Sequence, residues 1–302
     1  MLDKETIQIL ICCHKPSVLP ESDAFLPIHV GAALSSVSLD MQRDDALKEL
    51  PCDNISNKNK NFCELTAIYW ALKNIEVLYP QIKYIGLNHY RRYFSFTEKD
   101  NRKNHIAKNV KEISNYKIDK ALLEKYLENG FVIVPKKARI KKSVAEHYEH
   151  AHNSEDLREL HLIIKEKFPE YIDSFNEVFQ RQNYFYDCNM FVMDFQEFKK
   201  YASWLFSVLF ALEEKINISN YNDYQKRIFG FLSERLFTVW IKHHNCKLKE
   251  LNYFVYTENP KHWKNTFLFN LKFHLSSLKQ KILFCLERES KKEKLERYWK
   301  VP

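Results

Sequence analysis

The sequence predicts an α/β protein with a mostly parallel sheet flanked by helices. Two nearly continuous apolar runs, at 6–13 and 131–135, are typical of strands covered on both faces. Between them, apolar side chains recur every three or four residues from 62 to 75, which predicts a helix with one buried face. A further strand-like run follows at 82–87, and strand–helix–strand order favours parallel pairing.

Bulk composition fits a folded chain and excludes several protein classes. The 302 residues are 45% apolar and 28% charged, which is typical of a globular protein. Only four glycines occur, and no glycine-rich fingerprint follows the first strand, which argues against a dinucleotide-binding fold or a P-loop. The seven scattered cysteines contain no Cys-x-x-Cys pair, so we expect free thiols in a reducing compartment. Without a signal peptide or a long apolar span, the expected location is cytoplasmic.

Positive charge is concentrated in two segments of the chain. Residues 102–142 contain 12 Lys or Arg and 4 Asp or Glu, and residues 261–302 contain 11 and 4. The net charge of the whole chain is +8, so the remainder is acidic. Two basic segments on an acidic body favour contact with an anionic surface, either phospholipid or nucleic acid.

Polar residues follow the first strand and precede the first helix. His14 and Lys15 come directly after the apolar run and are candidates for nucleotide contacts. A dense polar segment at 53–59 leads into the helix, and a loop feeding a helix N-terminus is a natural anion site. Its candidate donor contacts are Asn54, Lys58 and Asn59. An ordinary capped loop explains the same residues equally well.

Residues 84–94 are the most distinctive stretch of the chain. The strand predicted at 82–87 runs into His89, Arg91 and Arg92, with tyrosines between them. Ligands of α/β proteins are usually held where strands end, and a guanidinium matches phosphate or carboxylate with its fork of donors. The alternative is a solvated basic turn.

The second half continues the alternation of helices and strands. A helix at 118–129, closed by Gly130, precedes the strand at 131–135 and a basic run at 136–142. Residues 143–182 are helical in pattern. His147, His150 and His152 invite a metal interpretation, but the zincin motif His-Glu-x-x-His is absent and a solvated helix face explains them better.

Two carboxylates and an arginine occur near the last predicted elements. Asp187 and Asn189 stand at the entrance to an apolar strand at 190–193. Helices follow at 195–216 and 224–241. Glu234 and Arg235 interrupt the apolar pattern of the second, so they either pair internally or face a site.

The tail from residue 266 onward has a leucine-rich stripe flanked by lysines, which predicts a basic amphipathic helix. Such a helix can lie on an anionic leaflet, or it can pack its stripe onto the body.

Five stretches together resemble a family of bacterial glycosyltransferase-like proteins from capsular polysaccharide, exopolysaccharide and lipopolysaccharide gene clusters. Many members are described only as a domain of unknown function, and some are assigned as galactofuranosyltransferases. The resemblance covers about residues 5–245, and one departure is Cys52, where members often have glycine. The stretches are Pro27-Ile-His-Val-Gly31, Asp53-Asn-Ile-Ser-Asn-Lys-Asn59 with Glu64-Leu-Thr-Ala-x-Tyr-Trp70, Gly86-Leu-Asn-His-Tyr-Arg-Arg-Tyr93, Asn189-Met-Phe-Val-Met193 and Arg227-x-x-Gly-Phe-x-Ser-Glu-Arg-Leu236.

The resemblance implies a GT-A-like fold that binds a nucleotide-sugar at the strand ends. Many such enzymes hold the diphosphate through a divalent metal on Asp-x-Asp. This chain has no Asp-x-Asp, and Asp44-Asp45 and Asp187-Cys-Asn189 are the nearest patterns. We therefore expect Arg91 and Arg92 to neutralise the diphosphate, with Mn or Mg open as a cofactor.

The predicted acceptor base is Asp187, with Glu234 second, because a carboxylate usually deprotonates the acceptor hydroxyl. The predicted donor-binding residues come from three polar segments of the first half, joined by two residues of the second half. They are His14, Lys15, Asn54, Lys58, Asn59, His89, Arg91, Arg92, Asn189 and Arg235.

The expected organisation is a transferase domain at 1–260 with a basic helical tail at 261–302. The expected activity is transfer of a sugar from a UDP-sugar to a lipid-linked glycan, with the tail on the inner face of the cytoplasmic membrane. UDP-galactofuranose is favoured by the resemblance alone. The alternatives are a non-catalytic nucleic-acid-binding protein, against which the basic segments lack a stacking motif, and a degenerate transferase that acts as a scaffold.

Overall fold

The computed structural model describes residues 2–48, 50–96, 106–107, 113 and 116–256. The predicted tail at 261–302 lies outside the described residues. Within the described part of the chain, no helix is long and apolar enough to cross a membrane.

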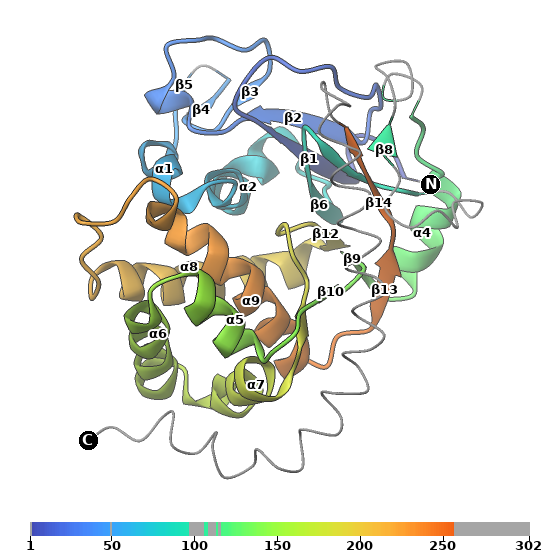
Figure 1. The fold of residues 1–302 in the computed structure, drawn as a ribbon. Coiled ribbons are helices and arrows are strands. Elements are labelled where there is room, and N and C mark those ends of the chain that lie inside the picture. Colours follow the sequence, from blue (N-terminus) through green and yellow to red (C-terminus); the bar gives the residue numbers. More distant parts are fainter. Residues whose placement is uncertain (1, 49, 97–105, 108–112, 114–115, 257–302) are drawn as a thin grey trace, which may run out of the picture.

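The main sheet is mostly parallel, as predicted, and helices flank it (Figure 1). Its principal order is β13-β9-β12-β6-β1-β2-β3. Only β12 runs against its neighbours on this path, since it is antiparallel to both β6 and β9. This is the GT-A-like arrangement that the sequence predicted. The strands are β1 (Ile7–Cys13), β2 (Phe25–His29), β3 (Gln42–Arg43), β6 (Tyr84–His89), β9 (Val132–Pro135), β12 (Phe191–Asp194) and β13 (Leu248–Leu251).

Further strands branch from the end of β6. The chain turns from β6 into β7 (Arg92–Phe94), which pairs with β14 (Tyr253–Tyr256), and β14 also pairs with β8 (Ile106–Ala107). The sequence prediction contained no strand after residue 241, so β13 and β14 were missed. Two small separate sheets consist of β4 (Ala46–Leu47) with β5 (Leu50–Pro51), and β10 (Ala138–Arg139) with β11 (Tyr184–Phe185).

The helical segments follow the predicted order, but the long segment at 143–182 is divided. Asn153 caps a new helix within it, and Pro169 begins a 3₁₀ turn. The α-helices are α1 (Asn59–Phe62), α2 (Leu65–Leu78), α4 (Lys120–Glu128), α5 (Val144–Ala151), α6 (Ser154–Lys167), α7 (Ile172–Asn176), α8 (Phe195–Glu213) and α9 (Ile228–His243). The short helices are η1 (Ala32–Leu34), η2 (Ser56–Lys58), η3 (Pro169–Tyr171), the π-helical η4 (Glu177–Arg181) and η5 (Gln225–Arg227).

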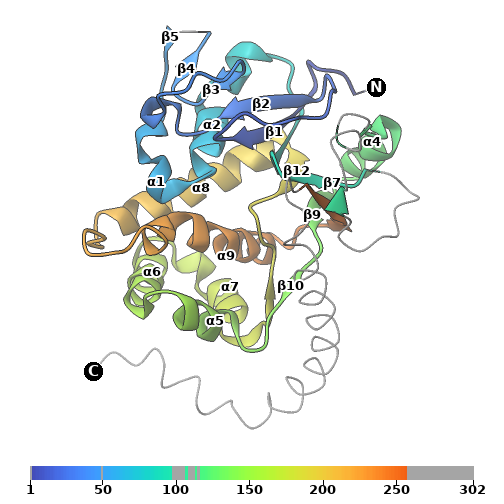
Figure 2. The ribbon, with the colours of Figure 1, turned by 45° about the horizontal axis from the view of Figure 1, so that its top comes forward.

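Each face of the sheet has its own apolar core. Leu10 and Cys12 of β1 belong to the core that α2, α8 and α9 share, whereas Ile9 and Ile11 belong to the core with α4 and β14. This alternation follows from the two-residue period of a strand. Helices α5, α6 and α7 form a further layer beyond α8 and α9 (Figure 2).

A close approach between β6 and β12 depends on Gly86. A Cβ at this position would lie 2.7 Å from the carbonyl oxygen of Phe191 and 2.8 Å from a methyl carbon of Val192. Because β12 is antiparallel to β6, the segment that enters β12 meets the segment that leaves β6. The fold therefore places 187–189 beside the His89–Arg92 turn.

Candidate functional site

The carboxyl ends of β1 and β6 define the place where a ligand is expected. These strands are parallel neighbours, and β2 and β3 extend the sheet from the far side of β1. The order of connection therefore reverses between β1 and β6, and open α/β sheets bind ligands at such a switch point. His14 follows β1 there, and His89 ends β6.

Three basic side chains, those of His14, Lys15 and Arg91, lie around the Tyr90 ring at this switch point. The His14 ring packs edge-on against it with 5.1 Å between centroids. Lys15 Nζ lies 5.9 Å from the ring centroid, and Arg91 Cζ lies 4.9 Å from it. Residues from the ends of two parallel strands thus gather around one aromatic ring.

Arg227 joins this group from η5, more than 130 positions later in the chain. Its Nε donates to Cys63 Sγ at 3.3 Å. Partial burial lowers the pKa of His14, and the charges of Lys15, Arg91 and Arg227 lower it further. Arg91 and Arg227 are exposed, and neither forms an ion pair with a carboxylate among the described residues. We term His14, Lys15, Arg91 and Arg227 the cationic cluster.

Two carboxylates belong to neighbouring elements: Asp187 lies where the chain enters β12, and Glu234 lies on α9. Burial raises the pKa of Glu234 to about 7; Arg235 opposes this rise, and Asp187 and Glu64 add to it. Burial also raises the pKa of Asp187, while Arg92 acts to lower it. The Asp187 Oδ1 atom is buried and accepts no hydrogen bond in the described structure. These are two acids in different surroundings within electrostatic range of each other.

The segment that presents Asp187 has unusual backbone conformation. Cys188 and Asn189 are consecutive residues with φ of 66° and 49°, in the left-handed region that side chains other than glycine rarely adopt. Cys63, which contacts Arg227, also has a positive φ of 52°. Such strain persists only where surrounding contacts hold it, and it is concentrated at functional sites.

Side chains from three elements hold this strained segment. His89 Nε2 lies 2.6 Å from the Cys188 carbonyl oxygen; since a carbonyl only accepts, Nε2 carries the hydrogen. Glu234 Oε1 accepts from the Cys188 backbone N–H at 2.8 Å. Asn189 donates to Glu64 Oε1 at 2.7 Å and accepts from Ser233 Oγ at 3.1 Å.

The comparisons with known proteins agree with this geometry. The family model described as a domain of unknown function, DUF4422, matches residues 8–245. The chain belongs to this family. The predicted resemblance to glycosyltransferase-like proteins, many of them known only as a domain of unknown function, is confirmed.

The DUF4422 chain is also similar to a solved structure, the apo form of the bifunctional glycosyltransferase WbbM. The two are 31% identical with a TM-score of 0.73, and the match covers 84% of this chain and 46% of that one. The chain thus spans about half the length of WbbM. No curated protein matches it.

Arg91 and Arg92 are adjacent in the DUF4422 chain but lie in different surroundings. Arg91 is exposed and belongs to the cationic cluster. Arg92 begins β7, is half-buried, and lies within electrostatic range of Asp187, Cys188 and Glu234. The prediction assigned both arginines to the diphosphate. In the structure, Arg91 lies in the cationic cluster and Arg92 lies close to the acids.

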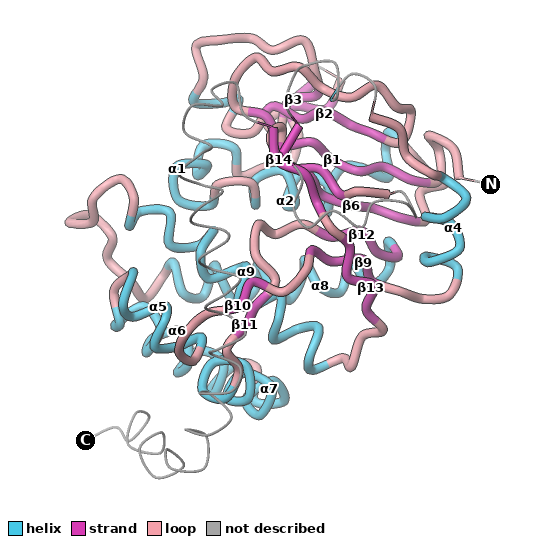
Figure 3. The backbone as a smooth tube through the Cα atoms, turned by 45° about the vertical axis from the view of Figure 1, so that its right-hand side comes forward, coloured by secondary structure: helices cyan, strands magenta, loops and turns pink. Residues whose placement is uncertain are grey.

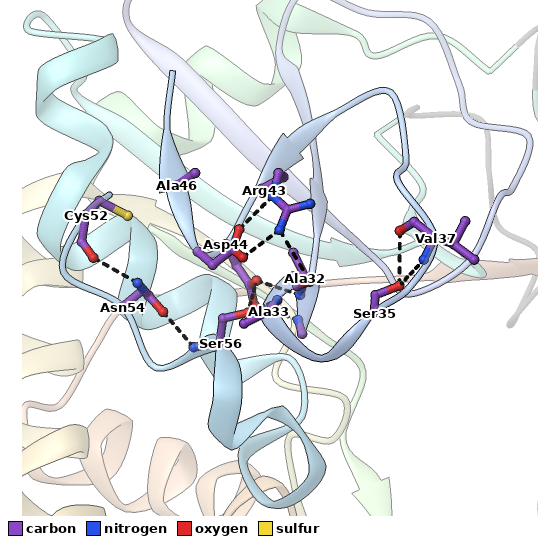
Figure 4. A network of polar contacts seen from close by, with 12 residues as sticks. Ala32, Ala33, Ser35, Val37, Arg43, Asp44, Ala46, Cys52, Asn54 and Ser56 are labelled. Atoms are coloured by element: carbon purple, nitrogen blue, oxygen red, sulfur yellow. Dashed lines mark hydrogen bonds and ion pairs between the residues drawn. The ribbon is translucent and has the colours of Figure 1, made fainter. Parts of the chain in front are cut away.

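The polar loop at 53–59 is occupied by its own structural contacts (Figure 4). Asn54 donates to the Cys52 carbonyl and accepts from the Ser56 N–H. Ser56 in turn donates to Asp44, a buried carboxylate that also accepts from the N–H groups of Gly31 and Ala32. This network fixes the turn after β2, and a donor contact by Asn54 stays a prediction.

Lys58 and Asn59 are likewise engaged within the fold. Lys58 Nζ lies 2.6 Å from Glu213 Oε2 on α8. Asn59 donates to the Cys63 carbonyl at 2.7 Å and to Thr66 Oγ1 at 3.2 Å. The structure does not bring these two side chains into the cationic cluster, so their donor roles also stay predictions.

Arg235 is buried inside the protein. Of the two alternatives from the sequence, this placement favours an internal pair with Glu234. Its side chain packs over the Phe185 ring at 4.5 Å and lies 3.8 Å from Glu234 Oε2. Nη2 donates to His147 Nδ1 at 3.2 Å, which requires a neutral His147, and burial together with Arg235 lowers the pKa of this histidine to about 4. Its predicted contact with the donor has no direct support from this placement.

The candidate carboxylate patterns do not fit a divalent cation. Both Asp44 oxygens accept hydrogen bonds, and Asp45 is paired with Arg43 at 2.6 Å. Asn189, the second member of Asp187-Cys-Asn189, uses both its side-chain atoms internally. Within the described residues, no three His, Cys, Asp or Glu side chains are grouped as a metal site.

The prediction named most of the residues that the structure gathers but omitted Arg227 and Glu64. Arg227 stood in the quoted motif Arg227-x-x-Gly-Phe, yet no local pattern connects it with a strand end two hundred residues earlier. Glu64 stood at the start of the quoted motif Glu64-Leu-Thr-Ala, but only the structure shows that it accepts a hydrogen bond from Asn189.

Proposed function

We propose that the chain is a glycosyltransferase that moves a sugar from a nucleoside-diphosphate donor to a glycan acceptor. The observation that supports this most strongly is the presence of two groups near the switch point: the cationic cluster around Tyr90, and the acids Asp187 and Glu234 beside the segment that His89 contacts. Membership of DUF4422 and similarity to WbbM, a bifunctional glycosyltransferase, point to the same reaction.

The cationic cluster suits the donor diphosphate. Arg91 and Arg227 are exposed guanidinium groups that can each present paired N–H donors to phosphate oxygens. Negative charge grows on the leaving nucleoside diphosphate as the glycosidic bond breaks, and fixed positive charges stabilise that development. A pKa of His14 held below its usual range keeps the imidazole neutral near pH 7, so it acts as a hydrogen-bonding group.

Asp187 is the proposed base that takes the proton from the acceptor hydroxyl. Its Oδ1 is uncommitted, and its raised pKa brings proton affinity closer to neutral pH, as a general base requires. Glu234 is anchored on the Cys188 N–H, and the charge of Asp187 contributes to its raised pKa. The positive charge of Arg92 on β7 lies within electrostatic range of both carboxylates and partly offsets their negative charge.

The finer proposals concern donor, acceptor and location. A UDP-sugar, with UDP-galactofuranose first, is the proposed donor, and a lipid-linked intermediate of capsule, exopolysaccharide or lipopolysaccharide synthesis is the proposed acceptor. Contact with the inner face of the cytoplasmic membrane through residues 261–302 is proposed from their sequence alone.

A thermal-shift screen across nucleotide-sugars tests this function. A ligand at one hundred times its Kd adds about 2.7 kcal/mol to stability, so the cognate donor should raise Tm on the order of 5 °C. The best donor is then incubated with glycan acceptors, with and without EDTA. No shift and no transfer with any donor would contradict the proposal, and loss of transfer in EDTA with recovery in manganese would refute neutralisation by arginine alone.

A further inference from the structure

The connection between β9 and α5 carries a dense positive charge that the proposed chemistry does not use. Residues 136–142 include five cations and no acidic residue: Lys136, Lys137, Arg139, Lys141 and Lys142. We term this segment the basic ribbon. It lies at the same edge of the sheet as the site, because it follows the carboxyl end of β9.

The basic ribbon is fixed on the protein. Ala138 and Arg139 form β10 and pair with β11, while the buried Ile140 donates its N–H to the Asn183 carbonyl at 2.9 Å. The Lys136 N–H bonds to the Leu251 carbonyl at 3.2 Å. Since its backbone is already ordered, a ligand that binds there does not have to order it.

Most of this charge is not neutralised within the described residues. Within the described part of the chain, the one carboxylate that pairs with the ribbon is Glu250, whose Oε1 lies 3.4 Å from Lys137 Nζ. Lys136, Lys141 and Lys142 are exposed. Like charges held close together repel, and an anion bound among them relieves that repulsion.

The aromatic ring of Tyr184 on β11 packs against the basic ribbon and is close in sequence to the proposed base, Asp187. Lys137 Nζ is 4.6 Å and Arg139 Cζ 5.8 Å from the Tyr184 ring centroid. Asp187 follows Tyr184 by three positions, so their Cα atoms are at most about 11 Å apart. The ring of the next residue, Phe185, packs against Arg235, which adjoins Glu234 on α9. Strands β10 and β11 run beside that helix (Figure 3).

We propose that the basic ribbon binds a phosphate or diphosphate group of the acceptor and thereby brings its hydroxyl to Asp187. This rests on the proposed function and adds the chemical class of the acceptor to it. The cationic cluster and the basic ribbon are then two anion sites on either side of Asp187, one for each substrate. The phosphate can belong to a prenyl diphosphate carrier or to a sugar phosphate.

The test measures binding of geranyl diphosphate by titration calorimetry, with excess UDP present to occupy the cationic cluster. Geraniol serves as the uncharged probe and glucose 1-phosphate as the sugar phosphate. The full chain is compared with Lys141→Glu/Lys142→Glu and with Lys165→Glu/Lys167→Glu, two exposed lysines of the last turn of α6. Tm values show that each variant is folded.

The expected result is binding of a phosphate probe but not of geraniol, weakened about tenfold or more by charge reversal in the ribbon and unchanged by reversal on α6. The stronger of the two phosphate probes identifies the source of the group. Equal affinity in all three proteins would overturn the proposal. So would a ribbon variant that loses binding only to phosphatidylglycerol vesicles or to a mixed oligonucleotide, since either outcome assigns the charge to a surface instead of a substrate.

A separate readout distinguishes this inference from the proposed function. If the ribbon binds a phosphate probe but no nucleotide-sugar shifts Tm or supports transfer, the transferase proposal fails and the anion site stands. If sugar is transferred equally well by the wild-type chain and the ribbon variant, the transferase stands and the acceptor site fails.

Discussion

Asp187 and Glu234 have similar chemistry but different surroundings. Glu234 accepts a backbone hydrogen bond and lies beside Arg235, whereas one Asp187 oxygen is buried without a partner. A carboxylate with one oxygen free of hydrogen bonds can exchange a proton with a substrate, whereas a carboxylate held by a backbone N–H contributes mainly its charge. The following two predictions separate these roles.

Asp187→Asn should abolish most of the turnover without destabilising the fold. General-base catalysis contributes at least about 100-fold, so kcat should fall by that factor or more. Because burial raises the pKa of Asp187, the fold disfavours its charged form, and a neutral amide of the same shape should leave Tm at or above the wild-type value. A lower kcat accompanied by a large fall in Tm would indicate a structural role.

Glu234 should make the protein less stable as pH rises. Its pKa is about 7 in the fold against 4.5 ordinarily, so the folded state holds a proton that the unfolded state releases between these values. The stabilising contribution is complete below pH 4.5 and is lost as pH rises to 7, with a limit of about 3 kcal/mol. Urea unfolding from pH 5 to 8 should therefore show a smaller decline for Glu234→Gln than for wild type. Parallel curves for the two proteins would contradict the shift.

At the scale of elements, the site depends on contacts between segments that are distant in sequence. Glu64 before α2, Ser233 on α9 and His89 at the end of β6 all bond to the two residues that enter β12. These bonds hold Cys188 and Asn189 in left-handed conformation, and Asp187 precedes them directly. The geometry of the proposed base is thus set by three elements at once.

Two substitutions of Asn189 should distinguish its bonds from its backbone conformation. Asn189→Gly removes the bonds to Glu64 and Ser233 but accepts a φ of 49°, whereas Asn189→Ala removes the bonds and adds left-handed strain. The alanine variant should be less stable by about 1 kcal/mol, and both should lose activity because Asp187 is no longer held. Urea unfolding and kcat are the measurements; equal stability of the two variants would show that the backbone is not strained.

The turn after β2 depends on a similar fit between Gly31 and Asn59. Gly31 has a φ of 69°, and a Cβ there would lie 2.8 Å from Asn59 Cγ. Gly31→Ala should cost roughly 2 kcal/mol or more from strain and overlap together. Asn59→Gly in the same protein removes the Cβ, Cγ and Oδ1 atoms that the new methyl would overlap, so it should recover only the overlap, and a double-mutant cycle should give a favourable coupling. Additive effects on the free energy of unfolding would contradict this contact.

At the scale of the whole molecule, the sheet brings chemistry from both halves of the chain to one edge. The order of connection reverses between β1 and β6, and this reversal defines the switch point. Because β12 is antiparallel to β6, the segment with Asp187 that precedes β12 lies at the same edge. His14, Lys15 and Arg91 of the first half thus lie at the same sheet edge as Asp187 of the second half. The basic ribbon adds a second positive region next to the acids.

Much of this was predictable because the signals are local. Continuous apolar runs predicted β1 and β9, a helical period predicted α2, and the strand end at His89 predicted the place of the site. What failed depends on pairing: β13 and β14 are short, half-buried strands defined by distant partners. Arg227 and Glu64 were missed for the same reason, and the engaged side chains of Asn54, Lys58 and Asn59 could not be told from free ones without their neighbours.

The central claim is that the cationic cluster binds the diphosphate of the donor. Its most direct test is calorimetric titration of UDP into the wild-type chain, Arg91→Ala, Arg227→Ala and the double variant, with Arg158→Ala as the exposed-arginine control on α6. Each loss of a charged hydrogen-bond donor should raise Kd by about tenfold or more, and the control should not change it. A wild-type Kd retained in the Arg91→Ala/Arg227→Ala protein would contradict the account.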